Sequence, residues 1–333
     1  MSPPDSSAQL PRIRVRTSGD FRDWLEAARA TLLATTYNSG KLAAFSIRRG
    51  KLAARFFRFA RPMGLAVNGP RIALAVRQEL LVYEAAPSDD PDAPPAGAYR
   101  LARRYATGSV DAHDLAFGRC GLVFVNTRHN CLARPSDDRR FVRAWRPPFI
   151  DRPVAKDCCH LNGLGMRGGQ PAMATAFCQG SEPKSWKSLD RYHSGVLLDV
   201  ARDAVVADGL CMPHSPRRYR GAWWLCDSGR GLLCRFDERE GRCVVAAELP
   251  GFTRGLHFAG QRALVGLSRI RAQHILDAPP IRERCPEPLA GVALVDVASG
   301  KLTGLLEFVQ GGNEVYEVAL LPGVLDLQLA PHA

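Results

Sequence analysis

The ten cysteines of this 333-residue chain include no Cys-x-x-Cys pair, so neither a zinc ribbon nor a thioredoxin-like motif is present. The chain also lacks any run approaching the roughly 18 consecutive apolar residues of a membrane helix. Its first ten residues lack the basic and apolar regions of a signal peptide. We therefore expect a cytoplasmic protein without membrane association, with reduced thiols and a disordered leader over residues 1–17.

Positive charge is plentiful, but it is not arranged as in nucleic-acid-binding proteins. The formal net charge is +12, yet the sequence shows no helix-turn-helix, no aromatic RNP-like strand and no Lys/Arg block. We therefore expect no nucleic-acid partner. Two interpretations of the basic surface stay open: it is merely solvated, or it attracts a small anionic ligand.

Six similar segments recur along the chain with the length of one propeller blade. Each can be aligned on one apolar or proline position: Leu65, Leu115, Leu164, Pro216, Leu256 and Val318. The spacings between these anchors are 50, 49, 52, 40 and 62 residues, which is typical of four-stranded blades with loops of variable length. The repeat predicts an all-β chain folded as a six-bladed β-propeller.

The expected strands can be counted around such a ring. Residues 18–30 predict a short helix, and five sets of four strands are expected over 63–106, 113–146, 160–210, 214–249 and 252–309. Three N-terminal strands (31–37, 42–47 and 52–59) and one C-terminal strand (314–321) remain. Together they make a sixth blade that closes the ring and removes exposed sheet edges. Residues 18–333 are thus predicted to form a single domain.

Three histidines, His113, His160 and His214, fall at or near the start of the first strand in three consecutive blades. In a propeller this strand lines the central channel, so the three rings are expected at one channel mouth. Converging imidazoles with open positions for water or substrate suit a transition metal, either zinc, iron, copper or manganese. The alternative is that each histidine caps the backbone of a neighbouring blade.

Charged and aromatic residues are expected around the same mouth. Asp114 and Glu317 are predicted to orient the imidazoles or, with Tyr316, to transfer protons. Arg254 joins this catalytic set because its guanidinium suits an anionic group. Five further residues are expected to bind substrate: Arg61, Asn126, Asn162, Arg217 and Asp227. The alternative for each arginine is a solvated loop position.

Cys159 precedes His160, which raises a second chemistry, a thiolate nucleophile activated by a base. Successive residues on a strand point to opposite faces, so these two side chains are not expected to pair directly. Cys159 is therefore either a catalytic nucleophile or a buried structural thiol. Cys158 shares the side parity of His160 and is the candidate for a soft fourth ligand.

Several strings resemble those of an uncharacterised bacterial family that carries a domain of unknown function. The strings are His-Asp-Leu-Ala at 113–116, Cys-His-Leu-Asn-Gly-Leu at 159–164 and Met-Pro-His-Ser-Pro-Arg at 212–217. More distantly, Pro-Met-Gly-Leu-Ala-Val at 62–67 is similar to six-bladed propellers of the NHL and gluconolactonase-like type. The resemblance implies the fold but no activity. The calcium site of the gluconolactonase-like enzymes does not carry over, because histidines stand at the comparable rim.

The residues lead to three functional hypotheses. The first is a metal-dependent enzyme that acts by oxidation or elimination on a small anionic molecule or a modified peptide. The second is a non-catalytic propeller that binds a peptide or protein on its rim. The third is a metal-free enzyme that uses Cys159.

Overall fold

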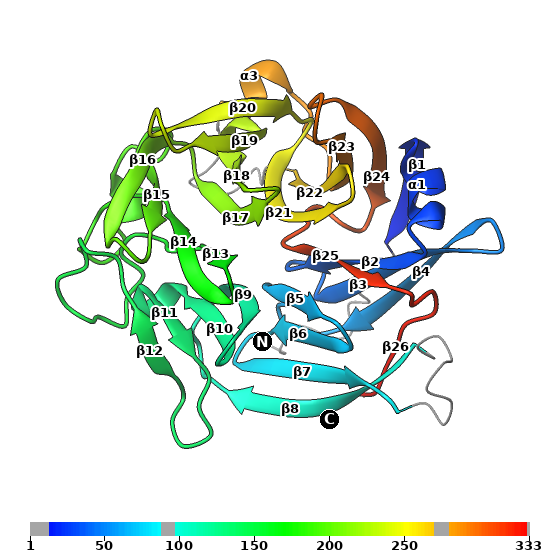
Figure 1. The fold of residues 1–333 in the computed structure, drawn as a ribbon, viewed down its shortest axis with the longest axis horizontal. Coiled ribbons are helices and arrows are strands. Elements are labelled where there is room, and N and C mark those ends of the chain that lie inside the picture. The colour runs from blue at the N-terminus through cyan, green and yellow to red at the C-terminus, as the bar shows by residue number, and fades with distance from the viewer. Residues whose placement is uncertain (1–12, 88–96, 270–279, 332–333) are drawn as a thin grey trace, which may run out of the picture.

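The computed structural model describes residues 13–87, 97–269 and 280–331. The described chain forms six β-sheets arranged as blades around a central axis, as Figure 1 shows in a view down the shortest axis of the molecule. The six-bladed β-propeller predicted from the repeat is confirmed. The helices of the described chain are short, and none has the length and hydropathy needed to cross a membrane.

Blades 1 to 5 each contain four strands that follow one another in the chain, and the first strand of each lies nearest the axis (Figure 1). Blade 1 contains β5 (Leu65–Asn68), β6 (Arg71–Ala75), β7 (Glu79–Ala85) and β8 (Ala98–Ala106). Blade 2 contains β9 (Ala112–Gly118), β10 (Gly121–Asn126), β11 (Cys131–Arg134) and β12 (Val142–Trp145). Blade 3 contains β13 (Gly163–Arg167), β14 (Gln170–Ala176), β15 (Gly195–Asp199) and β16 (Ala204–Leu210).

The next two blades follow the same pattern. Blade 4 contains β17 (Pro213–Tyr219), β18 (Ala222–Asp227), β19 (Leu232–Asp237) and β20 (Arg242–Glu248). Blade 5 contains β21 (Phe252–Ala259), β22 (Arg262–Ser268), β23 (Gly291–Asp296) and β24 (Leu302–Gln310).

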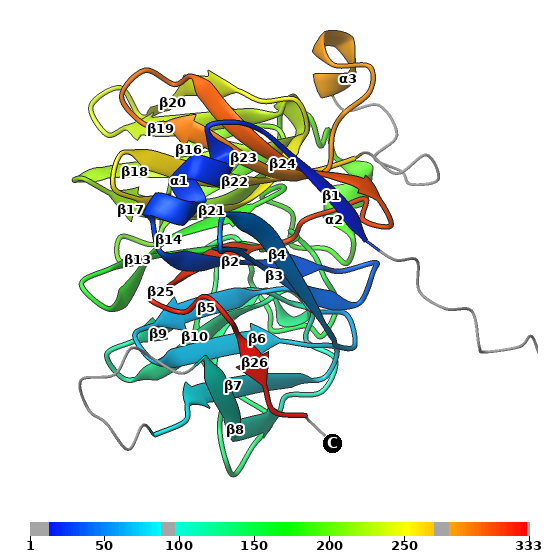
Figure 2. The ribbon, with the colours of Figure 1, turned by 90° about the vertical axis from the view of Figure 1, so that its right-hand side faces the viewer.

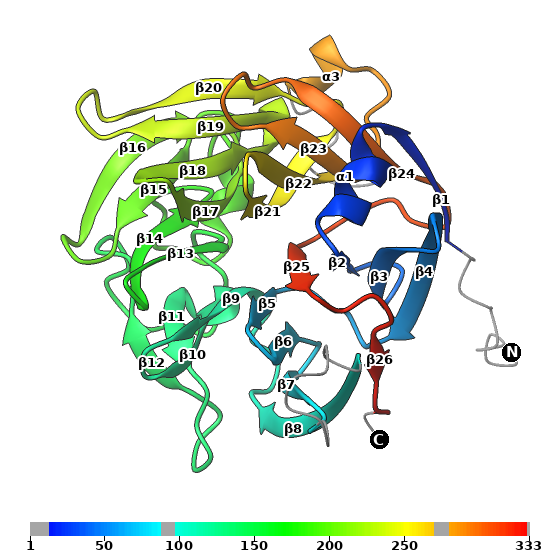
Figure 3. The ribbon, with the colours of Figure 1, turned by 45° about the vertical axis from the view of Figure 1, so that its right-hand side comes forward.

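The sixth blade closes the ring with strands from both ends of the chain. The C-terminal strand β25 (Val318–Pro322) pairs antiparallel with β2 (Ala30–Thr36), and β3 (Lys41–Arg48) and β4 (Lys51–Arg58) complete the sheet. Figure 3 shows β25 beside β2, with the inner strand β5 of blade 1 on its other side. The predicted closure is therefore confirmed, and the ring is closed by strand pairing between residues about three hundred positions apart, such as Leu32 and Leu320.

Two outer strands were not expected from the sequence. β1 (Arg14–Gly19) pairs with β24 and makes blade 5 five-stranded, and β26 (Gln328–Leu329) pairs in parallel with β8 and does the same for blade 1. The expectation of a disordered leader over residues 1–17 is therefore wrong for Arg14–Thr17, while residues 1–12 lie outside the described chain. The predicted helix over 18–30 is found as α1 (Phe21–Ala27), which buries Phe21 and Leu25.

The hydrophobic core is distributed between neighbouring blades. One cluster joins blades 5 and 6, where Phe45 lies 6.0 Å from Phe308 between ring centroids, and α1 covers its outer end. Another joins blades 2 and 3, where Val125 and Leu164 are buried. Because every blade buries side chains against both neighbours, the inner strands are fixed relative to one another. This rigidity positions the residues at the mouth of the channel.

The two other short helices mark one face of the disc. Seen edge-on in Figure 2, α2 (Ser185–Ser188) and α3 (Ile281–Arg284) lie on the same side, which is the side turned away from the viewer in Figure 1. α2 belongs to the connection between the second and third strands of blade 3. The candidate site lies on this face, because a residue of α2 lines it.

Candidate functional site

A pocket of about 280 Å³ opens at the channel mouth, and five of the six blades contribute to it. Three arginines and three carboxylates line it, namely Arg61, Arg254, Arg269, Asp111, Asp157 and Glu314. Two histidines and five other aromatic residues line it as well. The pocket thus combines charges of both signs with flat apolar surface, which is typical of a site for a small organic ion.

The backbone turns sharply just before the innermost strands. Arg61, Asp111, His160 and Met212 occupy equivalent positions in four consecutive blades, and all have a left-handed backbone with φ between 49° and 54°. This conformation is uncommon for residues other than glycine and clusters at functional sites. It brings Arg61, Asp111 and His160 to the pocket wall.

His113 and His214 are held in the same way in blades 2 and 4. Nδ1 of His113 lies 2.8 Å from the carbonyl oxygen of Asp111 and 2.7 Å from the hydroxyl of Thr127. Nδ1 of His214 lies 2.9 Å from the carbonyl oxygen of Met212 and 2.8 Å from the hydroxyl of Ser228. A carbonyl oxygen can only accept, so Nδ1 carries the proton and Nε2 carries the lone pair.

His160 also reaches the pocket, although it stands two residues earlier in its blade than His113 and His214 do in theirs. Its Nδ1 lies 2.7 Å from Oδ2 of Asp157, and its ring packs between Phe177 and Trp186 with centroid distances of 4.4 and 4.5 Å. The ring meets that of His113 edge-on at 4.8 Å. The His113 and His160 imidazoles thus come together in the pocket. His214 does not line it, but its ring lies 5.4 Å from Phe177.

Asn162 takes in blade 3 the position that histidine has in blades 2 and 4. Its Nδ2 donates to the carbonyl oxygen of His160, and its Oδ1 accepts from the hydroxyl of Thr175. Asn162 is therefore committed to holding the backbone, and it is not part of the pocket wall.

Two arginines and two tyrosines form a stack across the pocket, which we call the Arg–Tyr stack. The guanidinium of Arg254 lies 4.4 Å from the ring centroid of Tyr316, the Tyr316 and Tyr37 rings lie 6.0 Å apart at 28°, and the guanidinium of Arg61 lies 4.7 Å from Tyr37. Nη2 of Arg254 also donates to Nε2 of His214 at 3.1 Å. The predicted positions of Arg61, Arg254 and Tyr316 at the mouth are therefore found.

Asp114, Arg217 and Glu317 lie together, but not in the pocket. The Arg217 guanidinium binds Asp114 through both terminal nitrogens at 2.9 and 3.2 Å, and Glu317 through Nη2 at 2.8 Å. It also donates to the carbonyl oxygens of Leu164 and Leu256. We call this group the buried hub, and it joins the innermost strands of blades 2 to 6.

The contacts within the buried hub correct the functions that the sequence predicted for Asp114, Arg217 and Glu317. Carbonyl and hydroxyl oxygens orient His113 and His214, and Asp157 orients His160, whereas Asp114 and Glu317 bind Arg217 and main-chain N–H groups. Burial raises the pKa of Glu317 to about 7; the attraction of Arg217 opposes this shift, and the nearby Asp114 carboxylate adds to it. Neither these carboxylates nor Arg217 lines the channel-mouth pocket.

The remaining predicted residues are buried in the framework. Cys159 lies in the core between blades 2 and 3, and burial raises the pKa of its thiol well above the ordinary 9.0. The thiol of Cys158 donates to the carbonyl oxygen of Lys156. Asn126 accepts from the backbone N–H of His129, and Asp227 accepts from that of Cys211. None of these four residues lines the pocket, so a soft fourth ligand and a thiolate nucleophile find no support in their placement.

Trp186 is one of the pocket residues that the sequence did not indicate, as are Asp157 and Phe177. Trp186 lies on α2, in a connection between the second and third strands that is long in blades 3 and 5 and short in the other blades, so the repeat could not place it. The available signal was its position between the second and third strands of blade 3, since that connection lies on the rim predicted to carry the site.

Burial lowers the pKa of His113 and of His214 well below the ordinary 6.5, so both imidazoles are neutral near neutral pH. Unfolding exposes rings that take up protons below about pH 6.5, whereas the folded protein does not protonate them until a lower pH. These two groups therefore stabilise the fold above pH 6.5, and that contribution is lost as the pH falls.

The pH dependence of stability tests this burial. The test is a double variant, His113→Asn and His214→Asn, which places in blades 2 and 4 the asparagine that blade 3 has at this position, Asn162. We expect its unfolding free energy to decline less between pH 6.5 and pH 5 than that of the wild type. Denaturant unfolding at pH 8, 6.5 and 5 measures it. Glu317 has the opposite sign but is present in both proteins, so it cancels in the difference. A constant difference between the two proteins across this range would show that the rings are not protected from protons.

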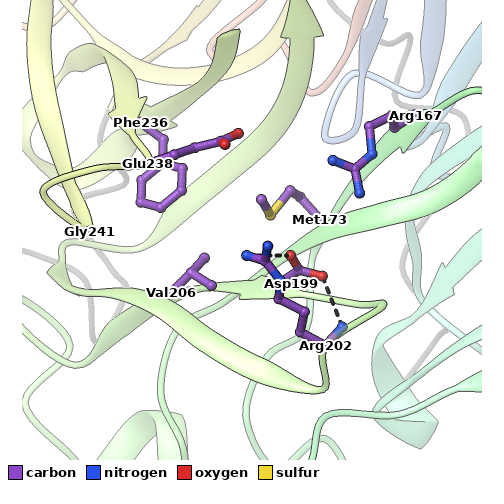
Figure 4. A pocket seen from close by; sticks show the side chains of 8 residues that line it. All are labelled: Arg167, Met173, Asp199, Arg202, Val206, Phe236, Glu238 and Gly241. Carbon is purple, nitrogen blue, oxygen red and sulfur yellow. Dashed lines mark hydrogen bonds and ion pairs between the residues drawn. The ribbon is translucent and has the colours of Figure 1, made fainter. Parts of the chain in front are cut away.

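Within residues 13–87, 97–269 and 280–331, no three His, Cys, Asp or Glu side chains stand close enough together to hold a metal ion. A second hollow carries less chemistry. A pocket of about 180 Å³ between blades 3 and 4 is lined by Met173, Phe236 and the Asp199–Arg202 ion pair (Figure 4). It contains no histidine. The channel-mouth pocket is therefore the candidate functional site.

Comparison with known proteins bears on the fold and the family. A chain in the crystal structure of a nidogen/laminin complex is 11% identical, with a TM-score of 0.56 over 88% of this chain and 99% of that chain. This likeness supports the propeller fold alone. A computationally designed protein, Ika8, aligns at 7% identity and a TM-score of 0.38 over 85% of this chain and 80% of that one, which is too low to bear on the fold. No curated protein matches the sequence. A family model described as a domain of unknown function (DUF4915) matches residues 19–329, and the chain belongs to this family.

Proposed function

We propose that the channel-mouth pocket is the active site of a metal-dependent enzyme that acts by oxidation or elimination on a small anionic molecule or a modified peptide. In this proposal His113, His160 and His214 hold a transition metal, either zinc, iron, copper or manganese. Arg254 and Arg61 hold the anionic group of the substrate. Tyr316 is the candidate proton donor, since it lines the pocket.

The observation that supports this proposal is the hydrogen bonding of the three Nδ1 atoms. Each lies within 2.9 Å of an oxygen, from Asp111, Asp157 or Met212. Metal-binding histidines nearly always donate their second ring N–H to a carbonyl or carboxylate in this way, because the bond fixes the tautomer and the ring direction. Neutral imidazoles such as His113 and His214 are also the form that binds metal.

Metal binding requires two rearrangements. In the described residues no three His, Cys, Asp or Glu side chains stand close enough together to hold a metal ion, so the three imidazoles have to move closer together. Nη2 of Arg254 donates to Nε2 of His214 at 3.1 Å, so the guanidinium has to leave this nitrogen before it can bind a metal. An anionic substrate in the pocket would draw the guanidinium away, since its remaining contacts are the faces of Tyr316 and Phe252.

Metal analysis of the purified chain tests the proposal. After incubation with Zn²⁺, Fe²⁺, Cu²⁺ or Mn²⁺ and desalting, we expect about one ion per chain for one of these metals. His160→Asn is expected to lose it, and Asp157→Asn is expected to weaken the affinity by about 10–100-fold, since it removes the oxygen that orients the ring.

His193→Asn is the matched control. His193 forms the same pair with an aspartate three residues earlier, with Nδ1 2.9 Å from Asp190, but it is exposed and outside the pocket. Its metal content is expected to equal that of the wild type. A protein that binds no stoichiometric metal, or keeps it in His160→Asn, contradicts the proposal.

The second candidate is a metal-free pocket that binds a peptide or protein on the rim, with the histidines as structural caps. The bond between Arg254 and His214 favours it, because a cation already occupies this imidazole nitrogen. Ligand binding that persists in a metal-free protein, together with a negative metal analysis, would select this candidate.

A further inference from the structure

Three side chains in the wall of the channel-mouth pocket carry buried hydrogen-bond donors that no described residue accepts. They are Nε of Arg254, the hydroxyl of Tyr316 and Nε1 of Trp186. Tyr316 is only 5% exposed, and burial raises the pKa of its hydroxyl, so this group stays protonated and donates. Buried donors are almost always paired in folded proteins. Three of them around one pocket indicate a ligand that supplies acceptor oxygens.

Arg254 also differs from Arg61 and Arg217 in its ionic contacts. Arg61 lies 4.0 Å from Asp111, and Arg217 binds both Asp114 and Glu317. Arg254 makes no ion pair within the described chain, and its hydrogen bond goes to a neutral imidazole. A guanidinium with a buried, unpaired Nε and no carboxylate partner in the described chain is suited to receive one from a ligand.

The charge of the pocket disfavours a ligand with more than one negative charge. Asp111, Asp157 and Glu314 line the same pocket, and together they offset its three arginines. A phosphate dianion would meet these carboxylates, whereas a carboxylate needs only one unbalanced cation. Much of the remaining wall is aromatic, with Phe177 and Trp186 in edge-on contact at 5.9 Å.

We propose that Arg254 and Tyr316 bind the carboxylate of the substrate, and that its flat apolar part lies against Phe177, Trp186 and Phe252. The substrate class is thus an aromatic carboxylic acid. This inference rests on the proposed function only in taking the channel-mouth pocket as the site; it does not depend on a metal.

Isothermal titration of the full chain tests it, with phenylacetate as the probe, phenylacetamide as its neutral analogue and inorganic phosphate as the dianion. The protein is measured after chelator treatment and again without it. We expect phenylacetate to bind at least about tenfold more tightly than the amide or phosphate. Tyr316→Phe removes one hydrogen bond to a charged group and is expected to weaken phenylacetate binding about tenfold. Arg254→Gln is expected to weaken it further.

Tyr83→Phe is the control for the loss of a hydroxyl. Tyr83 is fully buried in blade 1, and its hydroxyl also has no hydrogen-bond partner among the described residues, but it lies outside the pocket. Its substitution is expected to leave phenylacetate binding unchanged. Failure of phenylacetate to bind, equal binding of the amide or of phosphate, or unchanged binding in a folded Tyr316→Phe variant overturns the inference. Binding of phenylacetate to a chain that takes up no metal supports this inference while removing the metal-dependent function.

Discussion

Replacing Arg217 by alanine is expected to lower the free energy of unfolding by about 3–5 kcal/mol, because it leaves two buried carboxylates without their counter-charge. The side chains of Asp114 and Glu317 are only 3% exposed. Both accept hydrogen bonds from main-chain N–H groups, so neither can turn towards solvent without leaving donors unpaired. Denaturant unfolding at pH 8 measures the loss, since Glu317 is ionised there.

Arg218→Ala is the matched control. Arg218 is the next residue of β17 and is exposed, and single exposed arginines contribute little to stability. A change within about 0.5 kcal/mol is expected. If Arg217→Ala unfolds like this control but loses ligand binding, Arg217 belongs to the substrate site as the sequence suggested, and the structural part assigned to the buried hub is wrong.

The alternation of side chains along a strand explains why the sequence placed some site residues correctly and misplaced others. His113, Arg254 and Tyr316 stand two residues before their anchors, and all three line the pocket. Asp114, Arg217 and Glu317 stand one residue from theirs, so they point to the other side and meet one another. Neighbouring residues such as His113 and Asp114 therefore belong to two different groups, the pocket wall and the buried hub. Parity along the strand could have separated them, but the pairing of Arg217 with residues about one hundred positions away could not be predicted.

The fold was predictable to the extent that it repeats. The spacing of the anchors predicts six blades, and the strand count predicts the closure, because both depend on local pattern. β1 and β26 were not predicted because each occurs once, outside the six-fold repeat. The register of β1 is set by a partner strand whose residues lie almost three hundred positions away, as in the contact between Arg16 and Glu307. Trp186 was not predicted because it lies in a connection whose length varies from blade to blade, so the repeat gives it no position.

Gly255→Ala is expected to destabilise the protein by about 2–5 kcal/mol, because two costs add at this position. Gly255 has φ +73°, where a side chain costs about 1–2 kcal/mol. A Cβ would also lie 2.8 Å from Cα of Glu317 and 2.9 Å from the backbone nitrogen of Val318. These are main-chain atoms of blade 6, so they yield only if the two inner strands move apart, which costs about 1–3 kcal/mol more.

Gly260→Ala separates the two costs. Gly260 has φ +58° but no atom within 4 Å of the added Cβ, so it is expected to lose only the conformational part, about 1–2 kcal/mol. The difference between the two variants measures the contact between blades 5 and 6, and equal losses would show that this contact is loose. Because Gly255 follows Arg254, the displaced strand is also expected to weaken phenylacetate binding in Gly255→Ala and not in Gly260→Ala. That result would connect the closure of the ring to the geometry of the pocket, since the same inner strand carries the guanidinium and packs against β25.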